Sequence, residues 1–385
     1  MANRRTAPLA SALLLTFALA ACQEPSTQPA ATPLQAGSTL ALEATDGFAP
    51  DRGAIASLDE LFDVRSVDAR AINPSDYVCT NTSSVSAWLN AEVGKTVSAE
   101  LARIQLAVGY LADLIPTYEA LYFQSSAVTP QHYGVNGQFT HAIEKTDRDM
   151  KRFWAINSAN IDVVAMHGNV LVDTIRTART YRLLLGVSAP QAAIYARTLR
   201  SAFVGSTTMV DGNHPYFTFN AVAQLRVAGT DSVKKIVMGD GILQAYEALG
   251  FGDVAPQAIF AHEFAHHVQF EKAIRLTGAG ITAAERTRFG ELSADAMAAY
   301  YLTHARGLAM NKHRVAEFLQ IFLEIGDCSF TSSGHHGTPN QRMAAARFGF
   351  DVADQARPQG HILSPAAFHA LFLAKWPELI APDAD

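Results

Sequence analysis

The sequence predicts an α+β fold that is mostly helical, with a small sheet beside the helix that carries the candidate chemistry. Apolar residues recur at helical spacing over about 85–205, and two short apolar segments, 216–222 and 235–239, are typical of strands. A second run of helical pattern follows these strands. Hydrophobic residues make up 49% of the 385 residues and charged residues 17%, which excludes an intrinsically disordered or coiled-coil chain.

The charge balance argues against nucleic acid as a partner. The chain has 30 Lys and Arg residues against 36 Asp and Glu, so its formal net charge is −6. We find no local basic patch in the sequence that would hold a phosphate backbone.

Residues 1–21 are predicted to be a lipoprotein signal peptide. Arg4 and Arg5 precede an apolar stretch of 13 residues, Leu9–Ala21, and a membrane-spanning helix needs roughly 20. The stretch ends Leu19-Ala20-Ala21-Cys22, which resembles a bacterial lipobox. The resemblance implies lipidation of Cys22 and attachment to a membrane through it. An ordinary cleaved signal with a chance cysteine is the alternative.

The rest of the chain is expected to form a tether and two folded regions. Residues 22–57 are rich in Pro, Ser, Thr and Ala and predict a flexible tether, followed by a helical N-terminal region (58–205) and a C-terminal domain (206–385). Gln23 does not resemble an inner-membrane retention signal, so we expect a location in the bacterial cell envelope, on the outer membrane and facing the periplasm.

Two further cysteines could form a disulfide. Exported chains meet an oxidising compartment, and a bond between Cys79 and Cys328 would join the N-terminal region to the C-terminal one. Two independent buried thiols are the alternative, because the sequence does not give the distance between the two Cα atoms, on which a disulfide depends.

The candidate chemistry begins at His262-Glu263-Phe264-Ala265-His266. On a helix, His262 and His266 leave the same face about 5 to 6 Å apart at Cβ, which suits two imidazole nitrogens binding one zinc ion. Glu263 lies about 100° round the helix, so it is too far round to be a ligand but is placed to reach a water at the metal. The motif alone also arises by chance in surface helices.

A second block strengthens the prediction of a metal site. Thr282 and Glu285 form a potential capping box that starts a helix predicted to run to about Ala305, and Glu291 lies within it, 25 residues after His266. If this helix returns antiparallel, Glu291 could be the third ligand. Asp295, one turn later, could then accept the N–H of a ligand histidine. The alternative is two solvated acids that repel each other.

Taken together, these blocks resemble the gluzincins, thermolysin-like zinc metallopeptidases with His-Glu-x-x-His followed by Glu-x-x-x-Asp. The segments 266–269, 291–295 and 336–342 are similar to those of bacterial neutral zinc metallopeptidases, over roughly 210–350. The resemblance implies a zincin-like domain in 206–385, a Zn²⁺ cofactor, and a peptide or protein substrate. Zincins use an edge strand of their sheet to align an extended peptide.

The third block, 336–342, contains two further candidates. Thr338 and Gln341 are explained as a capping box with proline at the first helical position. His336 could donate to the developing oxyanion as a catalytic residue, with His335 as the competing choice that only the family pattern disfavours. Arg342 could bind a substrate carbonyl or a carboxylate of the site.

The expected function is therefore a zinc-dependent endopeptidase. In it, His262, His266 and Glu291 hold the metal and Glu263 is the general base. One alternative is a catalytically inactive zinc-binding envelope lipoprotein that serves as a binding or scaffold module. Another is a structural lipoprotein whose helical half carries the biological role.

Overall fold

The computed structural model describes most of the chain after residue 82. The described residues are 83–95, 100, 104, 111–225, 233–310, 312–324, 326, 335–356 and 360–381. The predicted signal peptide and tether lie outside them, as do Cys22, Cys79 and Cys328. The lipidation and the disulfide therefore stay predictions.

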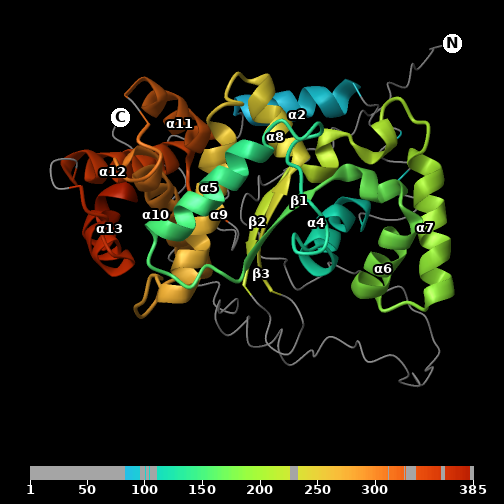
Figure 1. Ribbon diagram of the computed structural model, residues 1–385, viewed down its shortest axis with the longest axis horizontal. Coiled ribbons are helices and arrows are strands. Elements are labelled where there is room, and N and C mark those ends of the chain that lie inside the picture. The colour runs from blue at the N-terminus through green and yellow to red at the C-terminus, as the bar shows by residue number, and fades with distance from the viewer. Residues whose placement is uncertain are drawn as a thin grey trace, which may run out of the picture.

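The described residues form a mostly helical α+β fold with a small three-stranded mixed sheet (Figure 1). The helices are α2 (Ser84–Lys95), α4 (Leu111–Phe123), α5 (Thr140–Phe153), α6 (Thr174–Leu185), α7 (Ala189–Phe203), α8 (Asp240–Ala248), α9 (Ala255–Lys272), α10 (Ala283–Thr303), α11 (Lys312–Glu324), α12 (Pro339–Ala356) and α13 (Pro365–Leu379). The described residues also form the short 3₁₀ helices η2 (Gly168–Val172), η3 (Val210–Gly212) and η4 (Pro215–Thr218).

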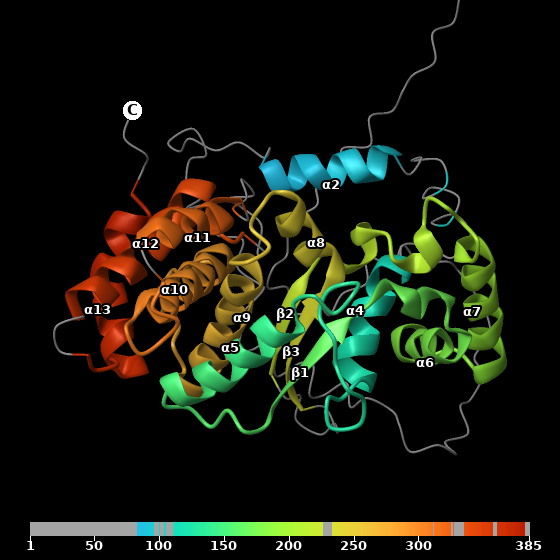
Figure 2. The same cartoon turned by 45° about the horizontal axis from the view of Figure 1, so that its top comes forward.

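The sheet has the strand order β1-β3-β2 and lies near the middle of the molecule. β1 (Ile161–Met166) runs parallel to the central strand β3 (Lys234–Gly239), and β2 (Ala221–Gln224) runs antiparallel to it. Side chains alternate between the two faces of each strand. One face packs against α4, and the other joins the largest core together with α5, α8 and α9 (Figure 2).

The prediction of an all-helical stretch over 85–205 is wrong for β1. The segment Ile-Asp-Val-Val-Ala-Met at 161–166 is a short apolar run, and such a run does not distinguish a strand from a buried helical segment by periodicity. Only pairing with β3, about 70 residues later in the chain, makes it a strand. The sheet therefore joins the two regions that we separated near residue 205.

The predicted strand at 216–222 begins later than expected. Pro215 stands at the start of η4, and the ring nitrogen Nδ1 of His214 accepts a hydrogen bond from the backbone N–H of Tyr216 at 3.2 Å, so the chain first makes a 3₁₀ turn. The strand starts at Ala221. The second predicted strand, 235–239, is confirmed as β3.

Predicted helix starts are confirmed where a side chain caps the helix. Ser188 caps α7, and Thr282 and Glu285 form the capping box of α10, which ends at Thr303 rather than near Ala305. At the start of α12, Gln341 N–H donates to Thr338 Oγ1 at 3.1 Å.

The packing of α12 against α10 brings the third sequence block to the second. A Cβ added to Gly349 on α12 would lie only 2.0 Å from the carbonyl oxygen of Ala296 on α10, so glycine, which has no Cβ, permits the two helices to approach this closely.

None of the described helices combines the length and the hydrophobicity that a membrane span requires.

Candidate metal centre

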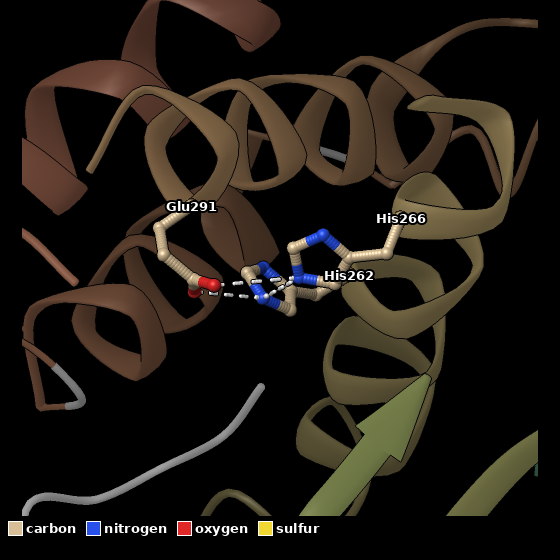
Figure 3. Close-up of side chains that lie close together, drawn as sticks. All are labelled: His262, His266 and Glu291. Carbon is tan, nitrogen blue, oxygen red and sulfur yellow. Dashed lines mark hydrogen bonds and ion pairs between the residues drawn. The ribbon is translucent and has the colours of Figure 1, made fainter. Parts of the chain in front are cut away.

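Helix α9 holds the two histidines in the core of the molecule. Its start is favoured by Pro256 in the first turn, and nearly all of its residues from 255 to 269 are buried, so α9 is packed on every side. His262 and His266 lie one turn apart, with ring centroids 4.8 Å apart and ring planes at 87°. Both imidazoles point toward α10 (Figure 3).

Helix α10 supplies a carboxylate to the same point. Glu291 lies beside the two rings (Figure 3), with its Oε2 3.3 Å from Nε2 of His262 and its Oε1 3.6 Å from Nε2 of His266. The two Nε2 atoms are 3.1 Å apart. The three side chains thus form a buried group that could hold a metal ion, and their ligand atoms all lie within 4.8 Å of one another.

The spacing of these atoms suits zinc. Ligand atoms about 2.0 to 2.1 Å from a tetrahedral zinc ion are separated from one another by about 3.3 to 3.4 Å. The three separations of 3.1, 3.3 and 3.6 Å bracket that value. Two nitrogens and one oxygen also match the ligand types that zinc takes in proteins.

Hydrogen bonds to the other ring nitrogens turn both Nε2 atoms toward this point. Nδ1 of His262 lies 2.7 Å from Oδ1 of Asp295, and Nδ1 of His266 lies 2.9 Å from Oε1 of Gln269. A carboxylate and an amide oxygen are acceptors, so in a neutral ring the hydrogen is on Nδ1 and Nε2 offers its electron pair. Three electron-pair donors therefore converge, as a cation requires.

The pKa values indicate that the group attracts one positive charge. Burial alone would lower the pKa of His262, but hydrogen bonds to Asp295 and Glu291 outweigh it and raise this pKa to about 9. Burial lowers the pKa of His266 to about 4, although Glu291 opposes this shift. Burial would raise the pKa of Glu291, yet His336 and His262 hold it well below its usual range. A proton on His262 can therefore take the place of a metal ion.

Arg342 and Asp295 form a buried ion pair behind His262. The Nε and Nη2 atoms of Arg342 each donate to a carboxylate oxygen of Asp295 at 2.7 Å, and Nη2 is also 3.5 Å from Oε2 of Glu291. All three side chains are almost fully buried. Of the two predicted roles of Arg342, the structure shows contact with a carboxylate of the site.

His336 contacts the group from the segment before α12. Its Nδ1 lies 3.1 Å from Oε2 of Glu291. Gly337 follows with φ of +102°, a backbone conformation that residues other than glycine rarely adopt. A Cβ at this position would also lie 2.9 Å from Leu292 Cδ2. His336 and His335 are both buried, and the structure places His336 against Glu291.

Glu263 is fully buried on α9, between the two histidines in sequence. Glu291 and Asp295 are buried as well, and the buried guanidinium of Arg342 pairs with Asp295. Buried charges need such compensation, because desolvation penalises them strongly.

Gln269 is the site residue that the sequence analysis missed as a participant. Its side chain contacts both His266 and the backbone of α10. Its position three residues after His266 is the available signal, since residues i and i+3 are neighbours on a helix.

Comparisons with protein-family models, with curated proteins and with solved structures found no match for this chain. The family resemblance therefore rests on the short blocks alone, and the metal group rests on the geometry above.

Proposed function

We propose that the protein is a zinc-dependent endopeptidase. The observation that carries the proposal is the convergence of His262, His266 and Glu291 at separations of 3.1 to 3.6 Å, with each histidine turned by a separate hydrogen-bond partner. His₂Glu with an open fourth position is the ligand set of catalytic zinc in thermolysin and carboxypeptidase A.

In this proposal the chain's own groups divide the work. His262, His266 and Glu291 would hold zinc, which when bound supplies a Lewis acid that activates water near neutral pH and polarises a carbonyl. Glu263 takes the proton of the attacking water and then delivers it to the leaving amine. His336 is proposed to donate to the developing oxyanion. Its Nδ1 lies against Glu291, so the donor would be Nε2.

The test of this function is Glu263→Gln on the zinc-loaded chain. We expect one zinc per chain, as in the wild type, and a loss of peptide cleavage of about 10²- to 10⁴-fold, because general acid–base catalysis is removed and no ligand is. Glu271→Gln is the matched control on the same helix, since Glu271 pairs with Lys234 at 3.2 Å. A Glu263→Gln protein that cleaves a fluorogenic peptide library at the wild-type rate would refute the role of Glu263.

One observation favours a second candidate, a zinc-binding module that does not cleave. The side chains of His262, His266 and Glu291 are only 1%, 8% and 4% exposed, and a peptide bond needs access to the fourth position. Zinc-loaded wild-type protein that cleaves no member of the library would favour this module. A role of the helical half alone is disfavoured, because β1 needs β3 for its pairing.

We also propose that the protein is anchored to the bacterial envelope through Cys22, on the outer membrane and facing the periplasm. The lipobox-like residues 19–22 and the tether-like composition of 22–57 support this. Labelling of growing cells with a palmitate analogue should mark the wild-type protein and not the Cys22→Ser variant. Equal labelling of both proteins would contradict the proposed anchor at Cys22.

A further inference from the structure

The side chain of Gln269 connects the two helices that carry the metal-binding group. Its amide oxygen lies 2.9 Å from Nδ1 of His266, and its amide nitrogen donates to the carbonyl oxygen of Gly290 at 2.7 Å. Gly290 immediately precedes Glu291 on α10. One side chain therefore touches one ligand of the group and the residue next to another.

The carbonyl of Gly290 decides which way the amide points. A carbonyl oxygen only accepts, so it must face the NH₂ end of Gln269, and the oxygen end is then left to face His266. An amide oxygen in turn only accepts, so Nδ1 of His266 must carry the hydrogen. The carbonyl thus determines, through two hydrogen bonds, that Nε2 of His266 presents its electron pair.

Gln269 is itself held firmly. It is 5% exposed and lies in the last turn of α9, where its backbone carbonyl accepts from the N–H groups of Ala273 and, at 2.9 Å, of Ile274. A buried amide bonded to a carbonyl at one end has one favourable orientation, because the flipped orientation would place two acceptors, the amide oxygen and the Gly290 carbonyl oxygen, face to face.

The two histidines are oriented by different chemistry. His262 faces the carboxylate of Asp295, whose two oxygens both accept, so Asp295 needs no further partner to present the correct atom. His266 faces an amide, which presents the correct atom only when something holds its other end. The contact with Gly290 is therefore necessary to present an acceptor to His266, whereas Arg342, which binds Asp295 behind His262, is not needed for that purpose.

We propose that Gln269 is the positioning residue for His266. Its amide, held by the Gly290 carbonyl, keeps the hydrogen of His266 on Nδ1 and ties the end of α9 to the residue before Glu291. This inference rests on the proposed zinc site, and it adds a residue that sets the geometry of that site without touching the metal.

The experiment compares three variants of the full chain. Gln269→Met keeps the length of the side chain and removes both hydrogen bonds. Gln269→Glu keeps an acceptor for Nδ1 of His266 and loses the donor to Gly290. Gln257→Met is the matched control, because Gln257 lies on the same helix and its amide bonds only locally, to the carbonyl of Asp253 at 3.1 Å.

The first readout is the tautomer of His266 in metal-free protein, by NMR of ¹⁵N-histidine-labelled chain, with the resonance assigned by its absence in His266→Gln. We expect the Nδ1–H tautomer in the wild type, in Gln257→Met and in Gln269→Glu, and a mixture in Gln269→Met. A pure Nδ1–H tautomer in Gln269→Met would overturn the inference, and a purely structural role of Gln269 would not move this readout.

The second readout is the affinity for zinc, by competition with a chromogenic chelator. We expect Gln269→Met to bind zinc about 10- to 100-fold more weakly, as for other residues that orient a metal ligand, and Gln269→Glu to recover part of this loss. Wild-type affinity in Gln269→Met would overturn the inference. If the wild type shows the expected tautomer but takes up no zinc, the proposed function fails while the orientation of His266 by Gln269 stands. Circular dichroism of each variant verifies the fold.

Discussion

Two buried glutamates, Glu119 on α4 and Glu291 on α10, are surrounded by basic groups in different ways. Glu119 accepts hydrogen bonds from Arg176 Nε at 2.8 Å and Nη2 at 2.6 Å, from Gln124 Nε2 at 2.7 Å, and from Arg179. Glu291 lies 3.1 to 3.6 Å from His336, His262, Arg342 and His266.

The difference separates a structural carboxylate from a candidate ligand. The guanidinium groups of Arg176 and Arg179, which can only donate hydrogen bonds, lie at hydrogen-bond distance from Glu119. The chain itself therefore compensates the charge of this carboxylate. The imidazole Nε2 atoms beside Glu291 are turned to offer electron pairs, and they stand at the separation that a shared ion sets. A buried acid among basic residues is thus a ligand candidate only when its neighbours can also be ligands.

Removal of the candidate ligand should have the largest effect. Glu291→Ala is expected to abolish stoichiometric zinc binding, because two histidines remain of a three-ligand site. Metal content per chain by mass spectrometry, after dialysis against metal-free buffer, measures this. Glu119→Ala is the matched control and should keep about one zinc per chain. An equal zinc content per chain in Glu291→Ala and the wild type would contradict the assignment of Glu291 as a metal ligand and of Glu119 as a structural carboxylate.

Weakening the support of His262 should have a smaller effect. Asp295→Asn keeps an acceptor for His262 but leaves the buried guanidinium of Arg342 without its carboxylate, so zinc affinity should fall roughly 10- to 100-fold. Asp351→Asn is the control, since it removes an exposed carboxylate that pairs with Arg347 at 3.1 Å. Chelator competition measures both, and equal affinities would show that the charge of Asp295 is not needed.

Zinc affinity should depend on pH through His262. Its pKa in the metal-free protein is raised to about 9, so below that pH zinc must displace a proton. We expect affinity to fall by about tenfold for each pH unit below 9, until other groups titrate. The same proton stabilises the metal-free fold fully below the unfolded pKa of about 6.5, and this stabilisation is lost as pH rises through 9. A pH-independent affinity between 7 and 9 would contradict this.

The smallest effect concerns Glu119. Its pKa is lowered, because the hydrogen bonds and charge of Arg176 outweigh the opposing effect of burial. A lowered carboxyl pKa stabilises the fold above the unfolded pKa of about 4.3, and this contribution is lost as pH falls below that value. Glu119→Gln removes the negative charge that pairs with Arg176 and Arg179, so it should lower the free energy of unfolding at pH 7. The loss should be only about 2 kcal/mol, because the two arginine side chains are 29% and 40% exposed and regain some water.

Denaturant unfolding at pH 7 and at pH 3.5 measures that loss. We expect the difference between Glu119→Gln and the wild type to shrink at the lower pH, with zinc content at pH 7 unchanged. A difference that is the same at both pH values would mean that packing, and not the ion pair, accounts for the effect.

Local features of the chain were predictable. The capping residues Ser188, Thr282 and Thr338 start helices as expected, because a side chain that bonds the first free N–H groups acts within three residues of itself. The shared face of His262 and His266 follows from helix periodicity alone. By contrast, β1 was missed, because its state depends on a partner strand that the local pattern does not contain.

The sequence by itself determined the types of group available for a metal and the spacing of the two histidines, since both are properties of one helix. Only the tertiary structure decided that α10 passes beside α9 with Glu291 facing the two rings, and that α12 brings Arg342 to Asp295. It also decided the orientation of His266 through Gln269 and Gly290, residues on two different helices. The physical reason is that helix periodicity acts over a few residues, whereas the convergence of three helices depends on how their buried faces pack.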